Sequence, residues 1–439
     1  MSDVKNISFS DKELGGSSPT SEKVSEVGVV EGLSQPKQNI FEICLSYARL
    51  DTGGDMSATG RWSNADGILT HAVVTYWLCD AVAPGNLRLG SSLVTLGFSW
   101  KVTISIIALG HFLISLAITA NSVIGARYHI PYTIQSRASF GFFFSFVVVF
   151  IRMLVGFFWY GLNTYTGAEC VNAVIIAIWP SFQNVPNHLP ESANITTQMM
   201  TAYDTTLHGS AYTWAFLSGL NSMLGNYGTM AVNINDFARY ARSSRMIVVQ
   251  IIIIPLSFMF MSFIGIIIAG AASDLYGKEI WDPLTIMSHW TGSHQSRAGA
   301  AFVGLSFVLA QLGSNISANC ISAANDLNAM FPRYINLRRG SYLIAFIGAW
   351  ALTPWNILSS AAALLDFMDG YVIWLAPITG VLLADYYVVH RRTYNIDEMY
   401  IPNGIYRYNK FGTNCRAVAA WLIGCVPLIP GFASSVRTI

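Results

Sequence analysis

Five polar side chains recur on one face of an otherwise apolar segment. They are Gln311, Asn315, Asn319, Ser322 and Asp326, at intervals of four, four, three and four residues, and this spacing predicts one face of a helix. Because unpaired polar groups are costly in hydrocarbon, such a row faces either a partner or a water-filled cavity. The row therefore predicts a site for a small polar molecule; the alternative is that its amides only hold helices together.

A second apolar segment combines an aromatic ring with an amide one helical turn later. Trp159 and Asn163 share a face there with Arg152, two turns earlier. A flat ring stacks on a planar heterocycle, while a carboxamide offers a donor and an acceptor to its edge. We expect Asn163 and Asn319 to recognise an imide or ureide together, with Tyr227 as a second stacking ring. The alternative is that Trp159 only packs against a neighbouring helix.

Hydroxyl and carboxylate groups in the apolar segments suggest where a cation binds. Ser314, beside the polar row, is a candidate ligand, together with carbonyl groups freed by a helix break near Ala83. Asp80 and Asp326 are candidates for proton coupling or for a gate. Asp326 lies near the end of its helix and close in sequence to Arg333, which favours a gate. No cluster of Cys, His and Asp has the spacing of a metal site.

The composition indicates the kind of element that positions these residues. Of the 439 residues, 53% are hydrophobic and 11% are charged, against about 25% charged in soluble domains. The chain is therefore expected to be an all-α polytopic membrane protein. The net charge of +1 argues against a nucleic-acid partner, and the scattered histidines without a catalytic motif argue against an enzyme. Nine candidate spans are long enough to cross a bilayer: 70–97, 101–124, 143–178, 211–233, 246–271, 298–322, 341–360, 368–389 and 416–434.

Two of these spans contain the residues of a broken helix. Pro84 and Gly85 interrupt the first span. The fourth contains Gly219, Gly225 and Gly228 around Asn221, Asn226 and Asn233. Paired interruptions of this kind are typical of transporters built from inverted repeats, in which the unwound segments meet near the membrane midplane at the substrate and ion site.

The arginine distribution predicts the orientation of the chain. Most arginines fall in loops on one side of the predicted helices, which places that side and the N-terminus in the cytoplasm. The polar segment 1–66 is expected to be a largely disordered cytoplasmic tail. Asn194 lies in a glycosylation sequon on the opposite side.

Several motifs together resemble the nucleobase-cation symporter-1 family, and within it the fungal uracil/allantoin/uridine/thiamine-type permeases. The segments that carry the resemblance are Gly125-Ala-Arg-Tyr-His-Ile-Pro131, Arg137-Ala-Ser-Phe-Gly141, Trp159-Tyr-Gly-Leu-Asn163, Asn233-Ile-Asn-Asp-Phe-Ala-Arg-Tyr240, Gln311-Leu-Gly-Ser-Asn-Ile-Ser-Ala-Asn319, Asn325-Asp326, Pro332-Arg-Tyr-Ile-Asn-Leu-Arg-Arg-Gly340 and Leu383-Ala-Asp-Tyr-Tyr387. They extend over roughly residues 60–435.

The resemblance implies a LeuT-like inverted-repeat fold and alternating access with a co-transported H⁺ or Na⁺. It implies that Trp159 stacks the substrate, that Asn319 hydrogen-bonds it, and that Tyr227 is the second stacking aromatic. The family usually carries Gln at the position of Asn163, so the shorter side chain leaves room for a ligand bulkier than uracil. Gln311 and Asn315 are expected at the same site.

The resemblance also assigns roles outside the substrate site. Ser314 matches a residue of the sodium site of bacterial members, and the cation is expected between Ser314 and Ala83. Fungal members are generally proton-coupled. Asp326 matches a gating carboxylate.

The chain departs from the family pattern in its number of helices. About nine of twelve are found; the fourth, fifth and twelfth are missing. The expected organisation is a tail over 1–66, a partial first repeat with helices 1–3 over 67–197, a short connection over 198–210 in place of a helical hairpin, a second repeat with helices 6–10 over 211–390, and a cytoplasmic loop with helix 11 over 391–439.

The predicted function is secondary active import, across the plasma membrane, of a small planar nitrogen heterocycle such as uracil, allantoin, uridine or a related nucleobase or vitamin, by cation symport. The alternative is a truncated or splice-variant permease product without transport activity. The expected partners are the heterocyclic substrate and the lipid bilayer, with no resident cofactor and no metal.

Overall fold

The computed structural model describes residues 70–184, 208–277, 280–350 and 353–438. These residues all belong to one unit of the chain, 40–439. The predicted tail over 1–66, the sequon at Asn194 and nearly all of the connection over 198–210 lie outside the described residues.

The first predicted span is a broken helix, as expected. It consists of α2 (Thr70–Ala81) and α3 (Pro84–Thr95), and Pro84 begins the second half. Proline fits this position because the first turn of a helix leaves its N–H groups without intrahelical partners. The chain then continues through α4 (Trp100–Tyr128), α5 (Tyr132–Phe140), α6 (Ser145–Ile178) and η2 (Pro180–Asn184).

The fourth predicted span is also broken, because α7 (Gly209–Asn226) and α8 (Gly228–Asn233) are separated at Tyr227. The next elements are α9 (Asn235–Ala238), α10 (Ser244–Ile247), α11 (Gln250–Tyr276), α12 (Pro283–Ser288), α13 (His294–Ser314), η4 (Asn315–Ile321), α14 (Ser322–Met330), α15 (Leu337–Trp350) and α16 (Pro354–Ile357). The last are α17 (Ala361–Ala384), η5 (Asp385–Val389), η6 (Asp397–Tyr400), η7 (Ile405–Arg407), α18 (Cys415–Cys425), η8 (Val426–Leu428) and α19 (Ile429–Thr438).

Six helical stretches in the described residues are long and apolar enough to cross a membrane: Trp100–Tyr128, Ser145–Ile178, Ser244–Tyr276, His294–Met330, Ala361–Val389 and Cys415–Ala433. They correspond to six of the nine predicted spans. The other three predicted spans, 70–97, 211–233 and 341–360, are interrupted helices.

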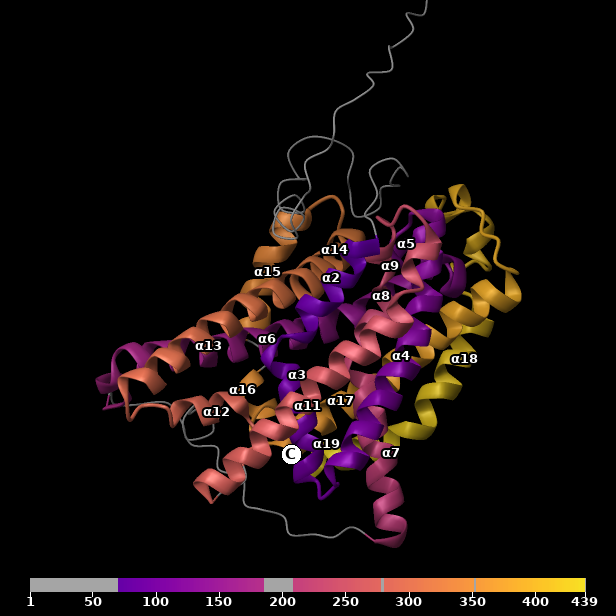
Figure 1. Cartoon of the computed structure of the whole chain (residues 1–439). Helices are drawn as coiled ribbons and strands as arrows, with labels where there is room; N and C mark the ends of the chain where they lie inside the picture. The colour runs from indigo at the N-terminus through magenta and orange to yellow at the C-terminus, as the bar shows by residue number, and fades with distance from the viewer. Residues whose placement is uncertain (1–69, 185–207, 278–279, 351–352, 439) are drawn as a thin grey trace, which may run out of the picture. The chain divides into compact units, whose positions relative to one another are not determined.

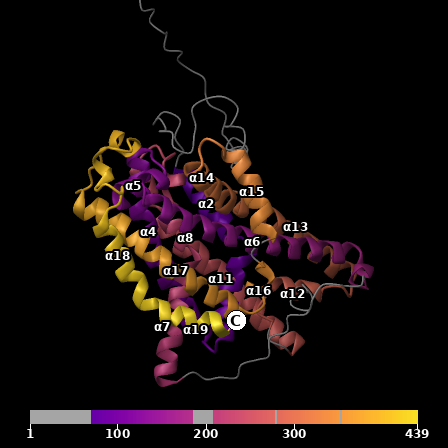
Figure 2. The same ribbon diagram turned by 180° about the vertical axis from the view of Figure 1, so that it is seen from behind.

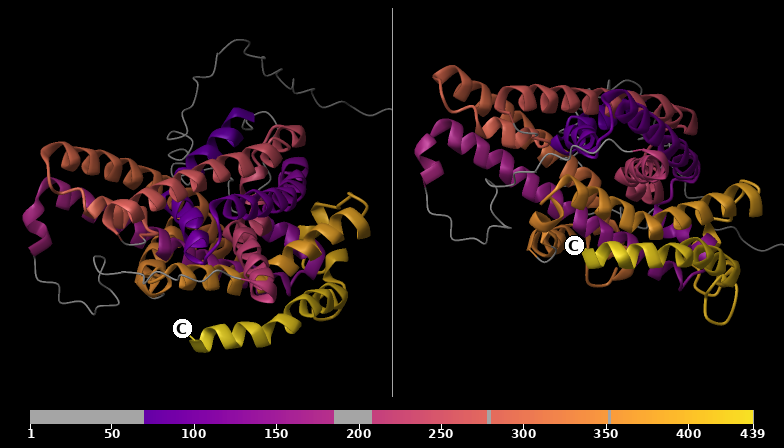
Figure 3. Two further views of the ribbon diagram at one scale, coloured as in Figure 1. Left: turned by 60° about the horizontal axis from the view of Figure 1, so that its bottom comes forward. Right: turned by 90° about the horizontal axis from the view of Figure 1, so that it is seen from below.

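The helices pack in two groups (Figure 1). The α4 group contains α2, α3, α4, α7, α8 and α11. Within it α2, α3 and α4 pack on α11, while α7 and α8 pack on both α4 and α17. The α6 group contains α6, α13, η4, α14 and α15. The groups meet where α2, α3 and α8 approach α6 and α13. Seen from behind, α17 and α18 run together beside α4, away from α13 (Figure 2), and α18 and α19 lie at the periphery (Figure 3).

Glycine allows the closest helix contact within the α4 group. A Cβ atom on Gly90 of α3 would lie 2.2 Å from the Ser262 carbonyl oxygen of α11, and one on Gly265 of α11 would lie 2.1 Å from the Leu87 carbonyl oxygen of α3. The two backbones therefore touch directly, which is how small residues stabilise helix pairs in membranes.

One end of the described unit collects the loops with most arginines. The helices α5, α9 and α14 lie at this end, which is at the top of Figure 1. We call it the arginine-rich end; the arginines in its loops and adjoining turns are Arg127, Arg137, Arg239, Arg242, Arg245, Arg333, Arg338, Arg339, Arg391 and Arg392. The loops therefore gather as the sequence predicts, while the cytoplasmic orientation of this end stays a prediction.

Candidate functional site

A cavity of about 80 Å³ lies between the two helix groups. Both helix breaks reach it, since Ala83 and Tyr227 are among the residues that line it. On the opposite wall are Trp159 of α6 and Asn319 of η4. A cavity of this size accommodates several water molecules, and its wall combines aromatic rings, amides and one carboxylate.

The face of α6 that was predicted from Trp159 and Asn163 lines this cavity. The Trp159 ring meets Phe367 and Tyr371 of α17 edge-on, at centroid distances of 6.0 and 6.2 Å. One turn later, Asn163 Oδ1 accepts a hydrogen bond of 2.6 Å from Gln311 Nε2. This bond fixes the orientation of the Asn163 amide at the cavity wall.

The predicted polar row is continuous and buried, and its members have different neighbours. Asn319 lines the cavity and donates through Nδ2 to Asn315 Oδ1 at 3.1 Å. Asn315 in turn donates to the Tyr160 carbonyl at 3.2 Å and to Thr164 Oγ1 at 3.1 Å, both on α6. Asn315 and Gln311 therefore lie behind the cavity wall, where they join α6 to the α13–η4–α14 segment and hold the amides that face the cavity.

A π-helix, η4, occupies the middle of the polar row and was not predicted. It spans Asn315–Ile321, so both Asn315 and Asn319 belong to it. π-Helical turns are rare and often occur at functional sites. Nothing in the residue spacing distinguishes this segment from an ordinary α-helix.

The residues predicted for cation binding lie around a carboxylate. Ala83, Ser314 and Asp80 all line the cavity, and the Tyr227 hydroxyl donates to Asp80 Oδ2 at 2.5 Å. Among the described residues Asp80 forms no ion pair. Tyr227 therefore donates a hydrogen bond from its phenol to the Asp80 carboxylate. The sequence had suggested only its ring, for stacking.

Side chains satisfy the backbone groups that the helix breaks release. Asn86 Nδ2 donates to the carbonyl oxygens of Asp80 and Ala81 at 2.9 and 3.1 Å. At the second break the Tyr371 hydroxyl donates to the Gly225 carbonyl. Because an unpaired carbonyl inside a membrane protein is costly, these bonds make the broken conformation stable.

Asp326 lies away from the cavity, and its partner was not predicted from the sequence. Its carboxylate forms a buried ion pair with Arg152 of α6, and its role as a gate stays a prediction. Arg152 also donates to Ser322, and Asn233 of α8 donates to the same hydroxyl. We call Arg152, Asn233, Ser322 and Asp326 the Arg152 cluster. It joins the two helix groups towards the arginine-rich end.

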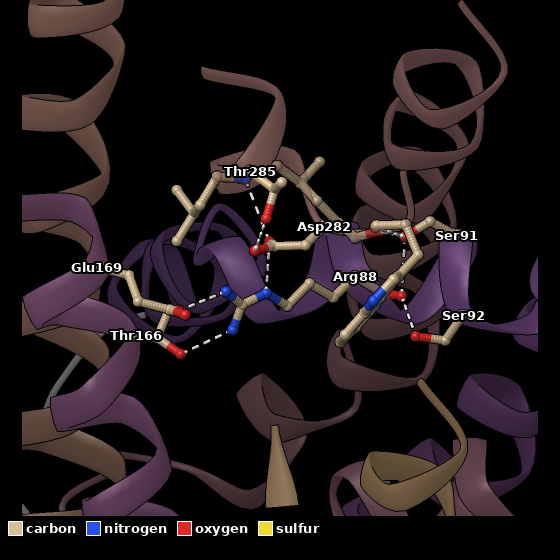
Figure 4. A network of polar contacts seen from close by, with 10 residues as sticks. Arg88, Ser91, Ser92, Thr166, Glu169, Asp282 and Thr285 are labelled. Atoms are coloured by element: carbon tan, nitrogen blue, oxygen red, sulfur yellow. Dashed lines mark hydrogen bonds and ion pairs between the residues drawn. The ribbon is translucent and has the colours of Figure 1, made fainter. Parts of the chain in front are cut away.

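A second charged cluster, centred on Arg88, includes Glu169, Thr166 and Asp282 (Figure 4). Arg88 of α3 donates through Nη2 to Glu169 at 2.6 Å, through Nη1 to Thr166 at 2.9 Å, and through Nε to Asp282 at 2.7 Å. Arg88 and Thr166 also line the cavity. We call these four residues the Arg88 cluster. Sequence reasoning missed it, although Arg88 and Glu169 are charged residues in largely apolar spans.

Comparisons of the sequence agree with the architecture. A family described as permeases for cytosine/purines, uracil, thiamine and allantoin matches this chain over residues 69–207 and 202–439. An uncharacterized permease of Schizosaccharomyces pombe is 36% identical, over 83% of this chain and 74% of the relative. The uracil permease of Saccharomyces cerevisiae is 29% identical, over 82% of this chain and 67% of the relative.

A solved structure has the same fold. Mhp1, a nucleobase-cation-symport-1 family transporter, in a closed conformation with bromovinylhydantoin bound, aligns with a TM-score of 0.61 at 17% identity, over 87% of this chain and 96% of its own. This likeness confirms the predicted all-helical, LeuT-like fold class. The expected absence of the fourth, fifth and twelfth helices is not confirmed and stays a prediction. The family matches are permeases and not enzymes, as predicted, and the chain belongs to the family of permeases for cytosine/purines, uracil, thiamine and allantoin.

Proposed function

We propose that this protein imports a small planar nitrogen heterocycle together with a cation, by alternating access. The observation that carries the proposal is the cavity in which two helix breaks meet Trp159, Asn163 and Asn319, in a chain that belongs to a permease family. Relatives named as uracil, allantoin and uridine permeases and as a thiamine transporter indicate the class of substrate.

The substrate ring stacks on Trp159, and the amides of Asn163 and Asn319 bind its edge. Stacking takes the flat face of a heterocycle, while each amide supplies a donor and an acceptor to alternating N–H and C=O groups. Gln311 and Asn315 act through these amides, because each forms a hydrogen bond with one of them. Tyr227 completes the aromatic part of the site.

The coupling cation binds beside the substrate, where Ala83, Ser314 and Asp80 line the same cavity. We favour a proton carried by Asp80 over Na⁺. A carboxylate in this cavity, hydrogen-bonded by a phenol and without an ion-pair partner among the described residues, is costly when charged and is relieved by a proton.

The arginine-rich end faces the cytoplasm of a plasma-membrane protein, in keeping with the bias of basic residues towards cytoplasmic loops. On this orientation the Arg152 cluster is the inner gate. Asp326 is its gating carboxylate, and Asn233 of α8 is the contact that separates when the two helix groups move apart.

The test is uptake of radiolabelled uracil, uridine, allantoin and thiamine by yeast that lacks its own transporters. We expect uptake of at least one compound, stimulated at low external pH. Trp159→Ala and Asn319→Ala are expected to abolish it while the protein still reaches the surface. The matched controls are Trp179→Ala, at the exposed end of α6, and Ser317→Ala, whose hydroxyl bonds back to the Gly313 carbonyl within its own helical segment. Absence of uptake from surface-localised protein would refute the transport proposal.

A further inference from the structure

The two charged clusters lie at opposite ends of the cavity and join the same two helix groups. The Arg152 cluster links Asn233 of the α4 group to Ser322 of the α6 group. The Arg88 cluster links Arg88 of the α4 group to Thr166 and Glu169 of the α6 group. A polar network therefore closes the space between the groups on both sides of the cavity. If the helix groups separate at one end of the cavity while the other end stays closed, only one of the two clusters is broken at a time.

The Arg88 cluster contains two carboxylates for one guanidinium. The side chain of Arg88 is 2% exposed, and those of Glu169 and Asp282 are 11% and 12% exposed, so the cluster lies largely out of water. All three nitrogens of the guanidinium are occupied, one by each partner. Because unpaired buried charge is costly, separation of Arg88 from a carboxylate must be compensated by another group.

The two carboxylates differ in how well they tolerate that separation. Asp282 caps α12 and accepts from the Leu284 N–H and the Thr285 hydroxyl, each at 3.1 Å, so it keeps two donors without Arg88. Among the described residues Glu169 has Arg88 as its hydrogen-bond donor. The other titratable groups that act on Glu169 are Asp282, on the segment before α12, and Tyr165 and Cys170, on its own helix. None of these supplies a positive charge.

We propose that Arg88, Glu169 and Asp282 form the outer gate of the transporter, and that opening it exchanges the Arg88–Glu169 ion pair for a proton on Glu169. When α3 moves away from α6, the Glu169 carboxylate loses its cation and takes up H⁺ from the external solution. When the gate closes, Arg88 pairs with the carboxylate again and the proton is released. A low external pH therefore favours the open outer gate. This inference rests on the proposed transport function and orientation, but its test does not depend on knowing the substrate.

The test measures how fast a membrane-impermeant thiol reagent, applied outside intact cells, reaches the cavity. Gly85→Cys is a suitable reporter, because Gly85 lines the cavity and a Cβ atom there meets no other atom within 4 Å. Labelling of the chain without this change gives the background from the native cysteines. With Glu169 intact, we expect slow labelling that accelerates as the external pH falls, once each rate is divided by that of a free thiol at the same pH to remove the change in thiolate fraction.

Glu169→Gln keeps the shape and a neutral acceptor for Arg88 but mimics the protonated state. We expect it to raise the labelling rate about tenfold at neutral pH, which corresponds to about 1.4 kcal/mol, and to remove the pH dependence. Thr166→Val removes only the hydrogen bond between Arg88 and its uncharged partner. It should raise the labelling rate less than Glu169→Gln does and should keep the pH dependence. The matched control is Asp274→Asn, which changes an exposed carboxylate in the last turn of α11. This variant should be labelled at the parental rate.

Labelling of Glu169→Gln at the parental rate, or with an unchanged pH dependence, would overturn the gate. The results distinguish a failure of the gate inference from a failure of the transport proposal. If uptake is observed but labelling does not respond, the gate inference falls and transport stands. If labelling responds but none of the four heterocycles enters, the substrate proposal falls while the gate stands. Surface biotinylation of each variant shows that the protein measured is folded and delivered.

Discussion

Breaking the Arg152–Asp326 ion pair should destabilise the protein more than any other single polar change in the Arg152 cluster. The side chains are 1% and 0% exposed, and removal of one partner from a buried pair costs about 3–5 kcal/mol, because the remaining charge has no solvent. Arg152→Met leaves the Asp326 carboxylate buried and should therefore lower the melting temperature strongly. Asp326→Leu leaves the Arg152 guanidinium without its ion-pair partner and should act in the same direction.

The double variant distinguishes an ion pair from two independent contacts. With Arg152→Met and Asp326→Leu combined, neither charge remains, and replacement of a buried pair by apolar residues of similar size is often close to neutral. We expect the double variant to be more stable than either single variant, with a coupling of about 3 kcal/mol or more. Ser322→Ala, which removes a neutral acceptor of the same cluster, should cost about 1–3 kcal/mol.

The assay is thermal unfolding of the detergent-purified protein, with all variants at one pH and salt concentration. A double variant whose loss equals the sum of the two single losses would refute the coupling, and with it the assignment of Asp326 to Arg152. Uptake adds a functional measurement: if the Arg152 cluster is the inner gate as proposed, a stable double variant should transport poorly although Trp159, Asn163 and Asn319 are unchanged.

Two further predictions concern packing and pH. Gly265→Ala should lower the melting temperature, because the new Cβ atom would lie 2.1 Å from the Leu87 carbonyl oxygen. The control is Gly270→Ala on the same helix, where a Cβ atom meets no atom within 4 Å and the change should be close to neutral. Equal melting temperatures of the two variants would contradict this prediction. The hydrogen bond with Asp385 raises the pKa of His390, so its stabilisation is fully present below about pH 6.5, the unfolded value, and is lost as the pH rises through the folded value. His390→Gln should therefore lower the melting temperature more at pH 6 than at pH 9, and an equal loss at both would refute the linkage.

Local features of the sequence predicted much of the fold. Apolar length gave the spans, and Pro84 with Gly85 correctly predicted the first helix break, because proline and glycine act within a few residues of their own position. The second break is also present, at Tyr227. The π-helix η4 could not be predicted, since the spacing of its polar residues is that of an ordinary helix face.

Contacts between distant residues were the least predictable part of the site. Asp326 is close in sequence to Arg333, seven residues away, but it pairs with Arg152, which is 174 residues away. Arg88 and Asp282 are separated by 194 residues. Charge alone identifies a residue that needs a partner in a membrane, but several arginines and carboxylates satisfy that need equally well until the helices are packed.

The structure divides the two explanations of the polar row among its members. Gln311 and Asn315 hold helices together, because their bonds run to Asn163, Tyr160 and Thr164 on α6. Asn319 reaches the cavity, yet its amide is oriented by Asn315. Helix packing and recognition are therefore not alternatives here: an amide can present a fixed donor and acceptor to a ligand only if its own rotation is restrained, and the residues that join the helices supply that restraint. The same bonds position the cavity wall and stabilise the packing of α6 on the α13–η4–α14 segment.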